Sequence, residues 1–287
     1  MGSVCAARWL PRSFHAGCGE FGRDPGLHCA AASVCRLHDR KVNAAEEGLS
    51  GFYWFDTLPF PAAEGAQTIT GMYSKLFHDG GKRFRVLTRH NHSPGGGGTA
   101  FPGYIYGCGK DEAVTAAGLQ ALLAHEMVHN RPTMLDEPAG VGTWYVEGSA
   151  EYYSTMVSLW MGLASLEESA KVINQKAGSY YQNPCHNLSN IELDKHYWTD
   201  RRCQRLPCAR GVLYLSNPAA QIQHSTDGKH SPIDIELALL RMEKPTAEDF
   251  LRIGSKLAGF DLRPEWEKMC RGILPPPIRR PSAVIAM

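Results

Sequence analysis

The chain has 287 residues, 43% of them hydrophobic, and its basic and acidic residues nearly balance, which leaves a net charge of +1. The length suits one large domain or two small ones, and the apolar fraction is sufficient for a hydrophobic core. The near-neutral charge gives no reason to expect nucleic acid or a membrane surface as a partner, and no apolar run approaches the ~20 residues of a membrane span.

The first 49 residues show neither helical nor strand periodicity, and we expect a poorly ordered segment there. This segment has arginines but no long apolar core, so it does not fit a secretory signal; the lack of acids before Glu20 leaves an organelle transit peptide as an alternative. Nine cysteines, an odd number with no C-x-x-C pair, favour a reducing compartment over a disulfide framework. We therefore predict a cytoplasmic location.

Residues 50–107 have the patterns expected of a small β-sheet with one helix. The helix is predicted over Thr68–Asp79 from apolar residues at helical spacing. A strand or extended segment is predicted over Gly51–Pro61, and a strand over the alternating Phe84–Arg89. Another strand is predicted over Thr99–Gly107 and is assigned to an edge because it contains a proline. The glycine-rich stretch His90–Gly98 is predicted to be a loop.

A longer helix is predicted over Asp111–Asn130, with Asp111 as its N-cap. It contains the pattern H-E-x-x-H at His125, Glu126 and His129, among apolar residues that predict a buried helix. Residues four apart lie on one face of a helix, so the two histidines can each offer a ring nitrogen to one metal ion at about 2.0–2.1 Å. Glu126, one residue on, can reach a water at the metal without binding the metal itself.

A catalytic zinc site needs a third protein ligand and one open position. A further histidine six residues after the second is excluded, because Leu135 stands there. The other solution is a glutamate on the following helix, predicted over Thr143–Ala164, where Glu147 in the segment WYVEG is suitably placed. Glu151, one turn later on the same face, is the alternative ligand. Gly148 is expected to let this helix approach the histidine helix closely.

The rest of the chain has the pattern of several helices separated by turns. Ser165 and Glu168 fit a capping box that opens a helix to about Lys176, and Tyr180–Asn190 is rich in turn residues. Later helices are predicted to begin near Gly211–Leu215 and to span Ile233–Met242, Ala247–Leu257 and Pro264–Arg271.

Two motifs in fixed order resemble those of the gluzincin metallopeptidases. The H-E-x-x-H motif at His125–His129 is followed by a W-x-x-E-G motif at Trp144–Gly148, with seventeen residues between His129 and Glu147. The YYS that follows, and LPCARG at Leu206–Gly211, are more similar to the glycyl aminopeptidase family than to the membrane alanyl type. The resemblance is specific over His125–Tyr153 and around Leu206–Gly211.

This resemblance implies a cofactor, a set of ligands and a fold. The cofactor is Zn²⁺, the ligands are His125, His129 and Glu147, and the general base is Glu126. The fold is an α+β, thermolysin-like gluzincin catalytic domain over residues 50–272. Its small β-sheet and zinc helix occupy residues 50–142, and a mostly helical subdomain occupies residues 143–272. Residues 273–287 are expected to form a tail.

The resemblance also implies which residues contact a peptide. Thr99 and Ala100 lie on the strand that corresponds to the substrate-binding edge strand of the family, although no acid stands there to hold a free amine. The alternative for this stretch is a plain glycine hairpin loop without a role in binding. Cys208 takes the place of a tyrosine whose hydroxyl donates to the oxyanion, and a thiol is a weaker donor. Tyr214, six residues along the same helix, should face elsewhere.

We therefore predict an aminopeptidase-like zinc metallopeptidase that hydrolyses peptides, with a peptide as its partner and neither nucleic acid nor a membrane. The oligomeric state does not follow from the sequence. Two alternatives stay open. In the first alternative, the chain is a catalytically weakened or inactive gluzincin homologue that acts as a binding protein. In the second, it is a metal-binding protein unrelated to peptidases.

Overall fold

The computed structural model describes residues 42–47, 49–55, 66–81, 83–91, 96–100, 103–109, 116–130, 135–138 and 140–274. Within these residues the chain forms a small mixed β-sheet followed by a mostly helical part. This is the coarse α+β arrangement that the sequence predicts.

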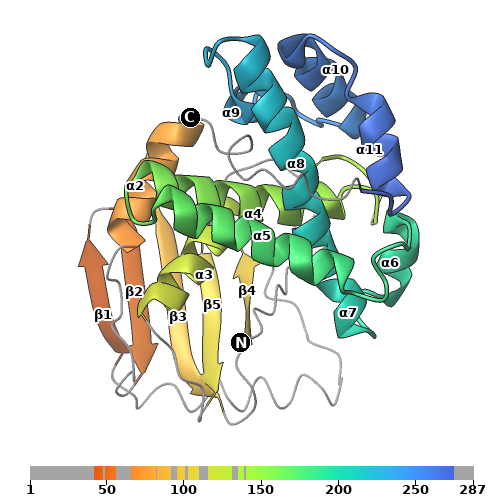
Figure 1. Ribbon diagram of the computed structural model, residues 1–287. Helices are drawn as coiled ribbons and strands as arrows, with labels where there is room; N and C mark the ends of the chain where they lie inside the picture. The colour runs from red at the N-terminus through yellow and green to blue at the C-terminus, as the bar shows by residue number, and fades with distance from the viewer. Residues whose placement is uncertain are drawn as a thin grey trace.

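The sheet has five strands in the order β1-β2-β3-β5-β4 (Figure 1). The strands are β1 (Val42–Glu47), β2 (Ser50–Phe55), β3 (Phe84–Asn91), β4 (Gly96–Ala100) and β5 (Gly103–Gly109). β2, β3 and β5 are parallel, and the edge strands β1 and β4 are antiparallel to their neighbours. The register places Phe52, Val86 and Tyr104 in one buried row, whereas Arg85 and Leu87 are exposed. The alternation predicted for this part of β3 is confirmed.

Two predictions about the sheet are wrong. β1 lies within the first 49 residues, where the sequence predicts no regular structure, because backbone pairing with β2 needs no alternation of side chains. The edge strand predicted over Thr99–Gly107 is two strands, β4 and β5, which pair antiparallel with each other. The glycines at 96–98, predicted as loop, belong to β4, because backbone pairing with β5 does not require side chains. Residues 1–41, the remainder of the segment predicted to be poorly ordered, and most of the tail lie outside the described residues.

The helices of the described residues agree with the predicted ones in most places. They are α2 (Ala66–Phe77), α3 (Ala116–Val128), α4 (Thr143–Trp160), α5 (Leu166–Tyr181), α6 (Asn190–His196), α7 (Arg201–Gln204), α8 (Leu206–Ser225), α9 (Pro232–Leu239), α10 (Ala247–Ala258) and α11 (Arg263–Cys270). The capping box predicted at Ser165 and Glu168 is confirmed. α8 begins five residues before its predicted start, because Pro207 fits the first turn of a helix, where a missing N–H costs nothing.

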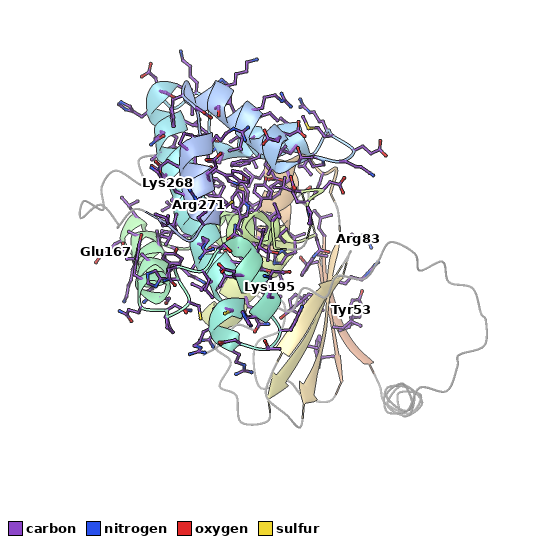
Figure 2. The ribbon with its side chains drawn as sticks, turned by 90° about the vertical axis from the view of Figure 1, so that its right-hand side faces the viewer. Tyr53, Arg83, Glu167, Lys195, Lys268 and Arg271 are labelled. Atoms are coloured by element: carbon purple, nitrogen blue, oxygen red, sulfur yellow. The ribbon has the colours of Figure 1, made fainter. Side chains whose placement is uncertain are left out.

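The helices cover one face of the sheet and then extend away from it. α2 contacts β2 and α3 contacts β5, while α4 packs against both α3 and α8. α8 to α11 lie at the side of the molecule far from β1 and β2 (Figure 1). Figure 2 shows the same separation from the side, with Tyr53 and Arg83 at the sheet and Lys268 and Arg271 on α11. Among the described helices, none is both long and apolar enough to cross a membrane.

α4 and α8 cross at a contact between two glycines. A Cβ atom added to Gly148 would lie 2.4 Å from the Cα of Gly211, and one added to Gly211 would lie 2.0 Å from the carbonyl oxygen of Trp144. Such distances leave no space for a side chain on either helix. The close approach that Gly148 permits is therefore to α8, and the prediction that it serves the contact with the histidine helix is wrong. This crossing positions the start of α8 beside Glu147.

An aromatic cluster fills the core beside this crossing. The ring of Trp144 meets those of Tyr214 and Phe250 edge-on, with centroids 5.1 and 5.7 Å apart. Tyr214 is buried in this cluster, so the prediction that it faces away from the candidate site is confirmed. Tyr152 and Tyr153 are also buried in the core.

Candidate metal centre

The candidate site is built on the last turn of α3, which is buried. Leu123, Ala124, Met127 and Val128 are each no more than 1% exposed, so the histidine pair is embedded in apolar packing. The hydroxyl of Tyr73, on α2, donates to the carbonyl oxygen of Ala124 at 2.8 Å. This hydrogen bond holds the backbone at the residue before His125. α3 ends at Val128, so His129 lies one residue beyond the end of the helix.

Three donor atoms from α3 and α4 converge in this site. The Nε2 atoms of His125 and His129 are 3.1 Å apart, and they lie 3.6 and 3.9 Å from Oε2 of Glu147. In a tetrahedral zinc site with bonds of about 2.0–2.1 Å, neighbouring ligand atoms lie about 3.3 Å apart. The three measured separations surround that value. Two imidazole nitrogens and one carboxylate oxygen are also the ligand set typical of catalytic zinc, so these residues fit the metal.

The three side chains perturb one another strongly, because all are buried. Burial disfavours the charged form of His125, but the carboxylates of Glu147 and Glu151 outweigh it and raise the pKa to about 9. Burial lowers the pKa of His129 to about 4, and the charge of Glu147 offsets this only in part. Burial also opposes ionisation of Glu147, yet the facing imidazoles lower its pKa to about 2. Glu147 is therefore negative and His129 neutral near neutral pH, while His125 holds a proton that a bound cation would displace.

Glu126 is buried beside this cluster and is 4% exposed. Its charge is one of the causes that raise the pKa of His125, so its carboxylate lies near the ring without being one of the three converging donors. The side chain of Asn130 donates to the backbone carbonyl of Glu126 at 3.2 Å and so holds this turn of the helix. The role of Glu126 as the general base stays a prediction.

Glu151 lies on the opposite side of the His125 ring. Its Oε1 is 3.7 Å from Nδ1 of His125, and Nζ of Lys176, on α5, lies 2.5 Å from the same oxygen. Glu147, in contrast, faces the Nε2 atoms of both histidines. Glu151 is therefore placed to orient the ring through the nitrogen that does not face the cluster, as carboxylates commonly do beside metal-binding histidines.

The start of α8 brings Cys208 to the cluster. Its thiol donates to Oε2 of Glu147 at 3.2 Å, although the two residues are 61 positions apart. Cys208 is thus near the proposed ligand, in the region where the resemblance expects a tyrosine. The other two residues expected to contact substrate, Thr99 and Ala100, lie on the edge strand β4, and their side chains are outside what the structure describes.

Sequence reasoning missed two residues that hold the site in place. Tyr73 is one of several apolar and aromatic residues of α2, and no local pattern distinguishes its hydroxyl from that of any other core tyrosine. Lys176 follows Glu151 by 25 residues, on a different helix. Neither contact has a signal in the sequence, because each depends on how two helices pack.

The described chain thus combines a small mixed sheet, a helix with two histidines and a second helix with a glutamate that meets them. The sequence matches no protein-family model and no curated protein. Solved structures do match, however, and they are aminopeptidases and zinc metallopeptidases.

An aminopeptidase N family protein from Idiomarina loihiensis matches with a TM-score of 0.63 and 13% identity, over 81% of this chain and 46% of that one. A variant of the M1 zinc metallopeptidase from Deinococcus radiodurans, bound to a Tyr-Ser-Ala substrate, matches with a TM-score of 0.60 and 12% identity, over 84% and 54%. Another structure of the Deinococcus radiodurans enzyme gives a TM-score of 0.58 and 14% identity, over 85% and 54%. The chain spans about half the length of these proteins. At such low identity the likeness shows a gluzincin-like fold, and the closer resemblance to the glycyl aminopeptidase family stays a prediction.

Proposed function

We propose that the chain is the catalytic part of a zinc-dependent peptidase. The proposal rests on the cluster of His125, His129 and Glu147, whose donor atoms lie within 4.8 Å of one another in a buried site. The likeness of the fold to zinc metallopeptidases, one of which holds a peptide, supports this assignment. The substrate we infer is a peptide.

Each residue of the cluster has a role in this proposal. His125, His129 and Glu147 hold the zinc. Bound zinc supplies a Lewis acid that polarises the scissile carbonyl and lowers the pKa of water to roughly 7. Glu126 takes the proton of the attacking water and returns it to the leaving amine, and its burial keeps bulk solvent from competing for that proton.

The edge strand β4 is the surface where we expect the peptide to bind. Among the described strands, β4 pairs with β5 alone, because it is the last strand in the sheet order. Backbone groups on the free side of an edge strand can pair with an extended peptide. Thr99 and Ala100 lie at the end of this strand and are the residues proposed to make the contact.

Cys208 is the reason for proposing a slow enzyme. Its thiol donates to Glu147 at 3.2 Å, and a thiol is a weak donor on a short side chain. Loss of one oxyanion donor typically costs about 10²–10³ in rate. The same observation favours the alternative function, in which the chain binds a peptide or a protein without turning it over.

Zinc content and peptide hydrolysis together test the proposal. We expect close to one zinc per chain and slow hydrolysis of a peptide library in the wild type. Glu126→Gln keeps the shape of the side chain, so zinc should stay while hydrolysis falls by about 10²–10⁴. Glu167→Gln, at an exposed position of α5 (Figure 2), is the matched control and should change neither.

Three results would redirect the assignment. Zinc-loaded wild type without any peptide turnover would support the binding-protein alternative. A parallel loss of zinc and hydrolysis in Glu126→Gln would give Glu126 a structural role. A wild type that binds no zinc would contradict the proposal altogether.

A further inference from the structure

A second group of metal-ligating side chains lies outside the candidate metal centre. It consists of Cys185, in the turn between α5 and α6, Cys203, in α7, and Asp200, which precedes α7. The two sulfur atoms and a carboxylate oxygen lie within 4.8 Å of one another. Cys203 is buried, at 1% exposed, and Cys185 is half-buried. The two thiols therefore face each other, and one of them is open to small reagents.

Asn183 holds the two cysteine-bearing segments in register. Its side-chain oxygen accepts from the backbone N–H of Cys185 at 2.9 Å. Its side-chain nitrogen donates to the backbone carbonyl of Arg202 at 2.9 Å, one residue before Cys203. One side chain thus bridges the backbones next to both cysteines, so the proximity of the thiols is built into the fold.

The surroundings of Asp200 argue against a metal at this group. Nε of Arg202 lies 3.0 Å from Oδ1 of Asp200, and Nη2 lies 2.6 Å from Oδ2. The backbone N–H of Arg202 also donates to Oδ1 at 2.8 Å, which caps α7. A carboxylate occupied by a guanidinium is a poor ligand, and the guanidinium repels a cation. Among the residues that the structure describes, two thiols then remain in this group without a third ligand.

We propose that Cys185 and Cys203 form a reversible disulfide when the protein meets a peroxide. The half-buried thiol of Cys185 reacts first: hydrogen peroxide is reduced to water, and Cys185 becomes a sulfenic acid. The sulfur of Cys203 then attacks the sulfenic sulfur. The S–S bond forms as the S–O bond breaks, and the hydroxide leaves as water with the proton of Cys203. A dithiol reductant reverses the step by exchange and is itself oxidised to a disulfide.

The electrostatics assign the order of these two steps. Burial and the neighbouring thiol of Cys185 raise the pKa of Cys203 to about 11, so Cys203 stays protonated and unreactive toward solvent reagents. Its sulfur can attack only a sulfur that the fold holds beside it, which is that of Cys185 once oxidised. Cys185 is therefore the residue that senses the oxidant, and Cys203 is the residue that resolves it.

The disulfide would fix the turn between α5 and α6 to the segment that leads into α8. Cys203 packs with Leu206 and Ala209 of α8 in a small core, to which Cys185 is adjacent. A cross-link from residue 185 to residue 203 ties the α5–α6 turn to this core. It also lowers the conformational entropy of the unfolded chain, which stabilises the folded state. For a loop of this length, we expect the Tm of the oxidised protein to exceed that of the reduced protein by about 5–10 °C.

Peptide mapping of the full chain tests the proposal. The reduced protein is treated with hydrogen peroxide, alkylated and digested with trypsin without reductant. Cleavage after Lys176, Lys195, Arg202 and Arg205 releases peptides 177–195 and 203–205. We expect them joined, with a mass lower by two hydrogens than their sum, and separated again by a dithiol. The rise in Tm should appear with the joined peptide.

Matched variants separate this pair from the other cysteines. Cys185→Ser, at a half-buried position, should abolish both the joined peptide and the rise in Tm. Cys270→Ser, another partly buried cysteine, should keep both. Peroxide that drives Cys185 to sulfinic acid without a link to Cys203, or a link from Cys185 to a different cysteine, would overturn the proposal. The proposal would also be overturned if His129→Ala kept its zinc and Cys185→Ser lost it, because the cysteine pair would then be a metal site. None of these outcomes depends on peptidase activity.

Discussion

The crossing of α4 and α8 should be intolerant of any side chain, and Gly148→Ala is the perturbation that measures this. The new Cβ would lie 2.4 Å from the Cα of Gly211, whereas ordinary contacts begin near 3.4 Å. The helices must therefore separate by about 1 Å, or their backbones must distort. Overpacking of this kind costs about 1–3 kcal/mol, and the better helix propensity of alanine returns up to about 1 kcal/mol.

The net loss of stability is then up to about 3 kcal/mol, which corresponds to a fall in Tm of up to about 12 °C for a domain of this size. Separation of the helices should also pull Cys208 away from Glu147, whose contact is 3.2 Å long. Zinc content should decrease along with Tm, because α4 carries a proposed ligand. Thermal unfolding and elemental analysis of the same samples measure the two effects.

Gly178→Ala is the control for this prediction. Gly178 lies inside α5, and no atom lies within 4 Å of the position that a Cβ would occupy. Alanine there gains helix propensity without a clash, so the protein should become more stable by about 0.5–1 kcal/mol. If Gly148→Ala behaves like Gly178→Ala, α4 and α8 do not cross as closely as described, and the reasoning is refuted.

Three further predictions concern the candidate metal centre. His129→Ala and Glu147→Ala should each lose zinc, because the two remaining donors bind it weakly. If Glu147→Ala keeps its zinc and Glu151→Ala loses it, Glu151 is the ligand and the roles of the two glutamates are exchanged. Glu151→Gln should keep the metal but lower zinc affinity by about 10–100-fold in chelator competition, and Lys176→Met should act in the same direction, because it holds that carboxylate. Cys208→Tyr should raise peptide turnover by up to about 10²–10³ at unchanged zinc content, because a phenol is a stronger donor than a thiol.

A control variant is available for Lys176→Met, and a contradicting outcome can be stated for Cys208→Tyr. Lys171→Met replaces an exposed lysine on the same helix as Lys176 and should leave zinc affinity unchanged. An equal loss in both variants would mean that the charge of α5 matters and that the contact with Glu151 does not. For Cys208→Tyr, a fast wild type with a neutral or harmful substitution would show that another group serves the oxyanion.

The features that the sequence predicted well are those that depend on local backbone geometry. The spacing of His125 and His129 predicts that both rings share one helix face, because that follows from 3.6 residues per turn. The alternation from Phe84 to Thr88 predicts one buried and one exposed face of β3 for the same kind of reason. The capping box at Ser165 is a contact between residues three apart. Each of these patterns lies within a few neighbouring residues.

The remaining features were decided by tertiary packing. Cys208 meets Glu147 across 61 residues, Gly148 lies against Gly211, and Tyr73 holds the histidine helix from a separate one. None of these pairs has a local signature, because the partner of each residue is set by how whole helices pack. β1 is a similar case, since a strand held mainly by main-chain pairing leaves little pattern in its side chains. The sequence by itself therefore determined which residues could bind a metal, and the packing of α3, α4 and α8 determined which of them meet.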